Sequence, residues 1–198
     1  MSVFQTVFDL ASTISINKRG VVAQTTSRNQ TTRAVSRGGQ VWRFDVKLPD
    51  GLPWDLTRGV IEGFDKADRF TVDSVQINRA SYNNWLTTYN GNCTGMSGAW
   101  TVGDQLTIAG GTGTVAFKAG DHLQLGSGHV YSVVNDLNSG TGVVTLNRPI
   151  IEPAGSASLI TGPNVTWSVM CTAIPTWTIF QRNQVSWSGA FSFIEVLV

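Results

Sequence analysis

The segment from residue 117 to residue 148 constrains the fold most, because short apolar runs in it alternate with turn signals. It reads FKAGDHLQLGSGHVYSVVNDLNSGTGVVTLNR. After the turn at Gly120-Asp121, polar and apolar residues alternate with a period of two, which predicts a half-buried strand over 122–125. Two more predicted strands, 129–134 and 143–146, follow after further turns. Together they predict an antiparallel meander.

The start of this meander has a counterpart earlier in the chain. The pattern Gly-Asp-x-Leu-x-aliphatic occurs at 103–108 and again at 120–125. From 90 to 113 the composition shifts to Gly, Asn, Ser and Thr, and the turn pairs in this stretch indicate a boundary. We therefore expect two hairpins of one small β-barrel, inserted at residues 91–157.

Strand patterns also occupy both sides of this insertion. Residues 41–48 alternate strictly, so that the even-numbered apolar residues face the core. Residues 13–16 and 21–24 flank a turn and predict a strand pair. The early strands need partners to complete a sheet, and the late ones can provide them, so we expect a discontinuous domain of residues 1–90 plus 158–198. The late strands are predicted at 157–161, 165–173, 176–184 and 190–197.

A single helix is predicted over residues 52–66. Apolar side chains recur at every fourth residue from Leu52 to Phe64, which places them in one stripe. Pro53 suits the first turn of a helix. The expected role of this helix is to cover one face of the sheet.

Composition favours a β-rich structural protein. The 198 residues are 41% hydrophobic, enough for a core, but only 14% are charged. Recurrent Thr, Ser, Val and Trp are typical of strands. No apolar run approaches the about 20 residues of a membrane span, and the first residues lack the pattern of a secretory signal. We expect neither a membrane partner nor a signal peptide.

Residues 27–39 form a polar, basic stretch. Arg28, Arg33 and Arg37 lie in it, and no carboxylate occurs between Asn17 and Val41. Such a stretch can be an arm that binds nucleic acid, but interleaved Thr and Ser without aromatic residues favour a surface loop or a strand that pairs with a neighbouring subunit. The net charge of +1 gives no general indication of phosphate binding, so nucleic acid is not an expected partner.

Catalytic signatures do not emerge from the sequence. His122, His129, Asp121 and Asp104 can be drawn as a metal or acid–base site. However, both aspartates follow glycine in turns, where a carboxylate accepts backbone hydrogen bonds, and both histidines alternate onto the polar face of a strand. The chain has no nucleophile elbow, HExxH motif or phosphate loop. We expect no enzyme activity, no cofactor and no catalytic or metal site.

The two cysteines, Cys93 and Cys171, lack CxxC spacing and nearby histidine pairs. Zinc binding is therefore not expected. Two free, partly buried thiols are the main expectation, and a single disulfide is the alternative.

The order of these features resembles a family of tailed-bacteriophage proteins, the distal tail and baseplate-hub structural proteins, over nearly the whole chain. The motifs that carry the resemblance are Gly120-Asp121-x-Leu-x-Leu-Gly126, the run Val130-Tyr131-Ser132-Val133 followed by Arg148-Pro149-Ile150, and the ending Trp187-Ser188-x-x-Phe191-Ser192-Phe193-x-Glu195. They are turn and strand patterns.

The resemblance implies a mainly β fold: a tail-tube-like β-sandwich or barrel domain with one packed helix and an inserted small β-barrel. It also implies a ring of copies, expected to be a hexamer, that connects the tail tube protein to baseplate hub or tail fibre proteins. The location would be the tail tip of the virion, after assembly in the host cytoplasm. Interface contacts are predicted for Arg28, Arg33, Arg37, Trp42, Phe191 and Phe193.

Two other functions stay open. The many aromatic residues suggest a carbohydrate-binding β module of a virion adhesion device, in which Trp100 and Tyr131 would stack on sugar rings. A tail-associated hydrolase is the second, but no pair of carboxylates forms a recognisable site for it.

Overall fold

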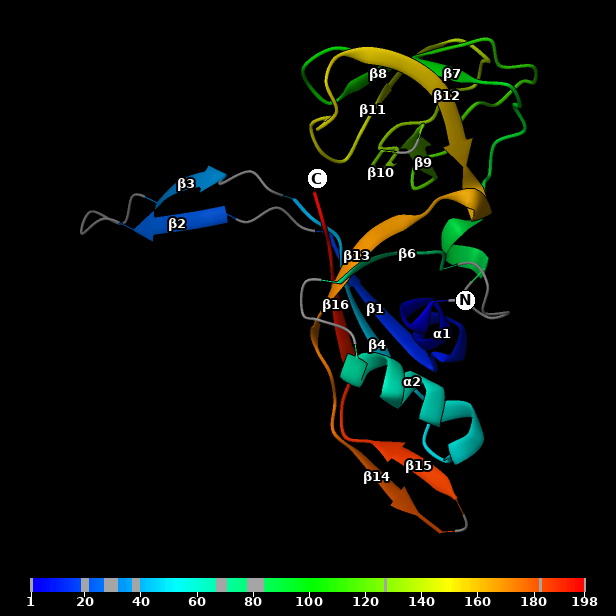
Figure 1. The fold of residues 1–198 in the computed structure, drawn as a ribbon. Coiled ribbons are helices and arrows are strands. Elements are labelled where there is room, and N and C mark those ends of the chain that lie inside the picture. Colours follow the sequence, from blue (N-terminus) through cyan, green and yellow to red (C-terminus); the bar gives the residue numbers. More distant parts are fainter. Residues whose placement is uncertain are drawn as a thin grey trace. The chain divides into compact units, whose positions relative to one another are not determined.

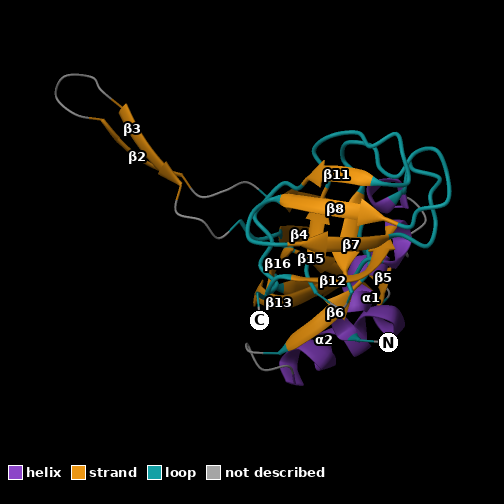
Figure 2. Cartoon of the chain, turned by 90° about the horizontal axis from the view of Figure 1, so that it is seen from above, coloured by secondary structure: helices purple, strands orange, loops and turns teal. Residues whose placement is uncertain are grey.

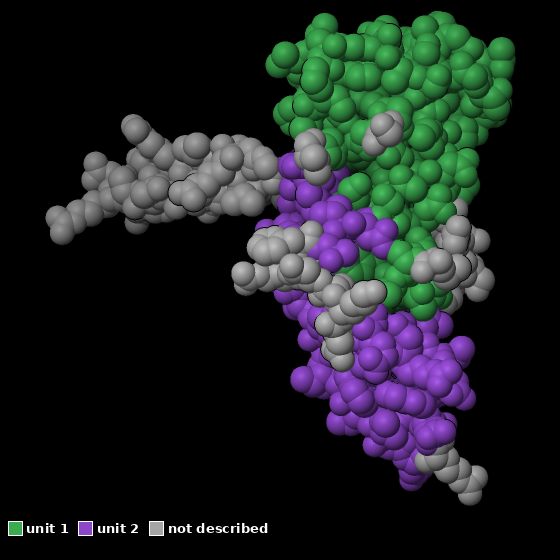
Figure 3. Space-filling view, in the orientation of Figure 1, with its two compact units in different colours: residues 1–9, 74–168 green, residues 10–73, 169–198 purple. Residues whose placement is uncertain are grey.

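The computed structural model describes residues 2–18, 22–26, 32–36, 40–66, 71–77, 84–126, 128–181 and 183–197. Within these ranges the fold is mainly β, as predicted. The chain divides into two compact units, coloured separately in Figure 3: one of residues 10–73 with 169–198 (purple), and a second of residues 1–9 with 74–168 (green). The predicted boundaries after residues 90 and 157 both lie inside the second unit.

Early and late strands share one five-stranded sheet (Figure 1). β4 lies between β1 and β16 and pairs with both in antiparallel fashion. The alternation predicted for 41–48 is confirmed, because Phe44, Val46 and the flanking Trp42 and Leu48 are all buried. The sheet order is β1 (Thr13–Asn17), β4 (Arg43–Lys47), β16 (Phe191–Glu195), β13 (Trp167–Ala173) and β6 (Val72–Val75).

The helix α2 (Trp54–Lys66) buries a face that overlaps the predicted stripe at Val60 and Phe64 but not at Leu56. Thr57, Val60, Ile61 and Phe64 are buried, whereas Leu56 is 55% exposed. At 3.6 residues per turn, positions i, i+3, i+4 and i+7 share a face, and steps of four residues drift off it. The predicted stripe also began too early, since Leu52 lies in the short strand β5 (Leu52–Pro53). The ring of Phe64 packs on that of Phe191, with centroids 5.0 Å apart.

A small sheet lies beside α2 (Figure 1). Its strands are β14 (Trp177–Phe180), β15 (Gln184–Trp187) and β5, in that order. The single strand predicted over 176–184 is wrong, because the chain reverses between β14 and β15. Asn183 has a φ of 67° there, a left-handed conformation that asparagine adopts more readily than most residues.

β2 (Val22–Thr26) and β3 (Thr32–Ser36) form a two-stranded hairpin. The predicted pairing of 13–16 with 21–24 is therefore wrong, since β1 pairs with β4 and β2 with β3. The stretch expected as a loop or an intersubunit strand contributes β3 to a pair within the same chain. Arg28, Arg37 and the side chain of Arg33 lie outside the described residues.

The second unit contains a six-stranded sheet, part of which is labelled in Figure 2. Its two ends meet at a bridge between Val133 and Leu146, where Val134 N also donates to Thr145 O at 2.8 Å. Leu106, Leu123 and Tyr131 belong to its core. The sheet order is β10 (Val130–Ser132), β9 (His122–Leu125), β12 (Gly155–Thr161), β7 (Ser97–Trp100), β8 (Gln105–Ala109) and β11 (Gly142–Thr145).

The predicted meander is confirmed for its first two strands, and the third meets the second only at its end, through the bridge between Val133 and Leu146. β9 and β10 form the expected hairpin, but β11 pairs with β8. The strand β12 is shared, since residues 155–158 pair with β7 and 159–161 with β9. A module ending at residue 157 would cut this strand in two.

A second helix, α1 (Val3–Leu10), was not predicted. It buries Phe4, Val7 and Phe8, and its Gln5 amide exchanges two hydrogen bonds with the backbone of Gln76, at 2.9 and 2.8 Å. Two short 3-10 helices, η1 (Asn84–Thr87) and η2 (Gly162–Asn164), complete the fold. Among the described residues, no helix has the length and hydropathy needed to cross a bilayer.

Candidate interface and binding surfaces

Three residues predicted to contact a neighbouring subunit lie in the core instead. Trp42, Phe191 and Phe193 are each at most 1% exposed. Phe193 is the register partner of Phe44, and Phe191 that of Val46, in the five-stranded sheet. Register partners share a face, so both phenylalanines lie on the buried face of β4. These aromatic side chains stabilise the protomer and present no surface to another copy.

The exposed apolar surface lies on β14. This strand is at one border of its sheet, and all four of its residues are exposed. Trp177 is 38% exposed, Ile179 54% and Phe180 40%. An exposed apolar edge strand is a template for pairing with another strand.

The segment that contains the β2–β3 hairpin is basic in sequence. Lys18 and Gln40, which flank the hairpin, are joined where the Gln40 amide donates to the carbonyl oxygen of Lys18. Residues 18–40 contain five Lys and Arg and no carboxylate, whereas residues 45–73, which include α2, contain seven carboxylates and four Lys and Arg. The two segments therefore have complementary net charge.

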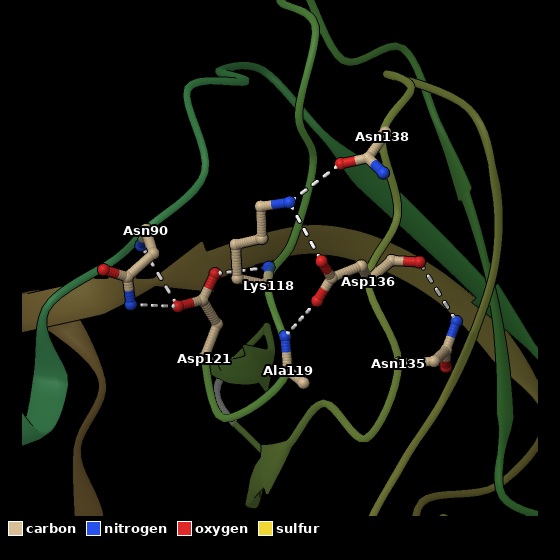
Figure 4. Close-up of polar contacts among 7 residues, drawn as sticks. All are labelled: Asn90, Lys118, Ala119, Asp121, Asn135, Asp136 and Asn138. Carbon is tan, nitrogen blue, oxygen red and sulfur yellow. Dashed lines mark hydrogen bonds and ion pairs between the residues drawn. The ribbon is translucent and has the colours of Figure 1, made fainter.

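The candidate acid–base residues Asp121 and His122 have structural roles. The Asp121 carboxylate is 1% exposed and accepts three hydrogen bonds (Figure 4). Asn90 donates its backbone N–H at 3.0 Å and its side-chain amide at 2.8 Å, and Lys118 N donates at 2.9 Å. The predicted turn role of this carboxylate is confirmed.

The prediction that His122 lies on the polar face of a half-buried strand is wrong. It is 4% exposed, and its ring packs edge-to-face against that of Trp167, with ring centroids 6.0 Å apart. Gln124 is also buried. Its side-chain amide donates to Gly128 O and accepts from the backbone N–H of Thr166. The segment carrying Thr166 and Trp167 thus covers the second face of β9. No cluster of three or more His, Cys, Asp or Glu side chains in the described ranges could hold a metal.

Lys118 and Asp136 close the loop before β9 (Figure 4). Their salt bridge is 2.9 Å long, and Lys118 Nζ also donates to Asn138 at 3.0 Å. Asp136 accepts from Ala119 N at 2.8 Å. This backbone bond and the nearby ammonium hold the pKa of Asp136 below its usual value. The contacts fix a loop and leave no open site.

The two aromatic residues suggested for sugar stacking are engaged in the fold. Tyr131 is fully buried; its hydroxyl donates to Glu152 and accepts from Ile151 N at 2.9 Å. Burial raises its pKa above the ordinary tyrosine value. Trp100 is half-buried, and its indole N–H donates to Pro153 O at 2.9 Å.

A groove of about 500 Å³ opens beside Tyr89 in the second unit. Its apolar lining includes Tyr89, Met96 and Leu159, and its polar lining includes Thr94, Thr161 and Asn164. Sequence reasoning missed this groove, because its walls come from segments about 70 residues apart that no local pattern connects.

Both cysteines are free thiols, as predicted. Cys93 is buried, and Cys171 is half-buried. Burial raises the pKa of the Cys171 thiol to about 11, so it stays protonated and weakly nucleophilic near neutral pH.

No protein-family model matches the chain, and a search of curated proteins gave no match.

Proposed function

We propose that this chain is a non-enzymatic structural component of a phage tail tip, which forms a ring of copies joining the tail tube to the baseplate hub or receptor-binding apparatus. The proposal places it in the virion after assembly in the host cytoplasm. The observation that carries it is the apolar edge strand β14, because a lone protomer leaves Trp177, Ile179 and Phe180 in water.

The hairpin supplies a second surface for self-association. An isolated two-stranded hairpin is marginally stable in water, so a further strand would stabilise it. β2 and β3 have only each other as partners among the strands that the structure describes. We propose that the basic hairpin of one copy meets β14 and the acidic α2 segment of the next.

This pairing joins two different surfaces of the same chain. Such a head-to-tail contact generates a closed ring when its rotation divides a full turn, and an open filament otherwise. The resemblance to distal tail proteins favours closure at six copies. The tail tube protein would contact one face of the ring, and hub or tail fibre proteins the other.

The oligomeric mass of the purified chain tests the proposal. We expect rings in electron micrographs and a mass near six protomers by light scattering. Ile179→Lys places a charge on the exposed edge and should yield monomers with an unchanged melting temperature. Val102→Lys is the matched control, since Val102 is 98% exposed in a loop of the other unit.

Three results would contradict the proposal. They are a wild-type protein that stays monomeric at high concentration, rings that persist in Ile179→Lys, and absence of the chain from phage particles.

A further inference from the structure

Tyr89 forms a rigid wall of the groove. Its hydroxyl donates to Ala116 O at 2.6 Å and lies 3.1 Å from Cys93 O. The Tyr89 ring packs edge-to-face against the ring of Phe117, with centroids 5.9 Å apart. A Cβ on Gly91 would lie 2.5 Å from the Tyr89 hydroxyl, so only glycine allows this approach. The position of the ring is therefore set before any ligand arrives.

The residue after Tyr89 is held as well. Asn90 gives both its backbone N–H and its side-chain amide to the buried Asp121 carboxylate (Figure 4). Asp121 in turn accepts from Lys118 N. This network fixes the segment that carries the Tyr89 ring, which makes Asp121 a positioning residue for the groove.

The groove exists because two strands part. Leu159 N still donates to Met96 O at 3.1 Å, which continues the pairing of β7 with β12. One step further, Thr94 exchanges backbone hydrogen bonds with Thr112 at 3.3 and 3.1 Å. The chain before β7 thus leaves β12, and the groove opens between the segments of Thr94 and Thr161.

The chemistry of the lining defines the ligand class. None of the residues that line the groove has a charged side chain, so the groove offers nothing to balance a buried phosphate or carboxylate. The aromatic ring of Tyr89 and the side chains of Met96 and Leu159 offer apolar surface. Hydroxyl and amide groups of Thr161 and Asn164 can both donate and accept hydrogen bonds. The Thr94 hydroxyl already bonds the Thr112 hydroxyl at 3.1 Å and can make one further bond. The Thr161 hydroxyl makes no cap bond to η2.

We infer that this groove binds an uncharged sugar ring of a glycan. The apolar face of the sugar would stack on Tyr89, and its hydroxyls would bond the amide of Asn164 and the hydroxyls of Thr94 and Thr161. A volume of about 500 Å³ lies within the range of ligand sites in proteins. This inference does not depend on the proposed ring, because no residue of β14 or the hairpin lines the groove.

The test is calorimetric titration of the full chain with three neutral probes: a β-glucan oligosaccharide, a galactan oligosaccharide and a chain of N-acetylhexosamines. We expect at least one to bind. Asn164→Ala and Thr161→Val should each weaken that affinity about tenfold, the effect of one lost hydrogen bond. Both should leave the melting temperature and the oligomeric mass unchanged. The matched control is Thr141→Val, an exposed threonine outside the groove, which should bind as the wild type does.

If none of the three neutral probes binds at about millimolar concentration, the inference is overturned. Equal binding by Asn164→Ala, Thr161→Val and wild type would also overturn it, as would binding of a sialylated or phosphorylated glycan in place of the neutral probes. Loss of rings in Ile179→Lys with sugar binding retained would confirm that the two surfaces are separate.

Discussion

Trp54 in α2 packs against Trp177 in β14, with ring centroids 5.6 Å apart and planes tilted by 40°. This contact joins the exposed edge strand to the helix. Among the strands that the structure describes, β14 pairs with β15 alone, so the indole pair provides a second attachment that keeps the strand in place.

The two indoles should be energetically coupled. Replacing Trp54 and Trp177 by alanine, singly and together, should give a coupling energy of about 0.5–1.5 kcal/mol, as for other aromatic pairs. Urea unfolding of the four proteins measures it. Trp100→Ala, in the other unit, should be additive with either change; strict additivity between Trp54→Ala and Trp177→Ala would contradict the contact.

Two glycine-to-alanine changes should have opposite effects on the stability of the fold. A Cβ at Gly140 would overlap the carbonyl oxygen of Gly111, a backbone atom that cannot move aside on its own, so Gly140→Ala should destabilise by about 1–3 kcal/mol. Gly59 lies on the exposed face of α2 with no atom near its potential Cβ. Gly59→Ala should stabilise by about 0.5–1 kcal/mol. Thermal unfolding of both variants checks the pair, and equal signs would refute it.

Asp121→Asn should destabilise the second unit by about 1–3 kcal/mol, because an amide NH₂ would face one of three N–H donors in a buried site. Hydrogen exchange at Asn90 and Lys118 should become faster. Asp136→Asn is the control, and since Asp136 is exposed its effect should be much smaller. Equal losses in the two variants would show that burial of Asp121 does not matter.

Alkaline pH should destabilise the fold through Tyr89. Burial raises the pKa of Tyr89 to about 12, above the ordinary value of about 10 in the unfolded chain. The unfolded state therefore loses this proton first as pH rises. The contribution of Tyr89 to the free energy of unfolding is fully present below pH about 10 and is lost as pH rises to about 12. Tyr131 contributes in the same direction. Urea unfolding across this pH range should show a shallower fall for Tyr89→Phe than for wild type, and an identical fall would contradict the assignment.

Local burial could be predicted from the sequence, but strand partners could not. The alternation at 41–48 was correct because a period of two reports which side of a strand faces the core. The same rule failed at His122, since both faces of β9 are covered. β11 pairs along its length with β8 and meets the β10 segment only at the Val133–Leu146 bridge, and β1 pairs with β4 in place of β2. Strand pairing is decided by long-range packing that a local pattern does not contain. The helix α1 was not predicted because its eight residues are too few to show a clear helical period.

The two candidate surfaces differ in how far the sequence could reveal them. The sequence predicted interface contacts for Trp42, Phe191 and Phe193, which lie in the core, and not for the exposed Trp177 and Ile179. Apolar side chains on buried and exposed strands look alike in a sequence. The groove beside Tyr89 depends on where β7 leaves β12, a tertiary feature without a residue pattern.

The pairing of β4 with β16 also sets an order of events at the ribosome. Trp42 N donates to the Glu195 carboxylate across 153 positions of the chain, so the first sheet is complete only after Glu195 has been translated. Residues 74–168 precede β16 in the chain and can fold before that sheet is complete. Until β16 is present, Phe44 and Val46 lack their register partners Phe193 and Phe191, so chains truncated before β16 should aggregate.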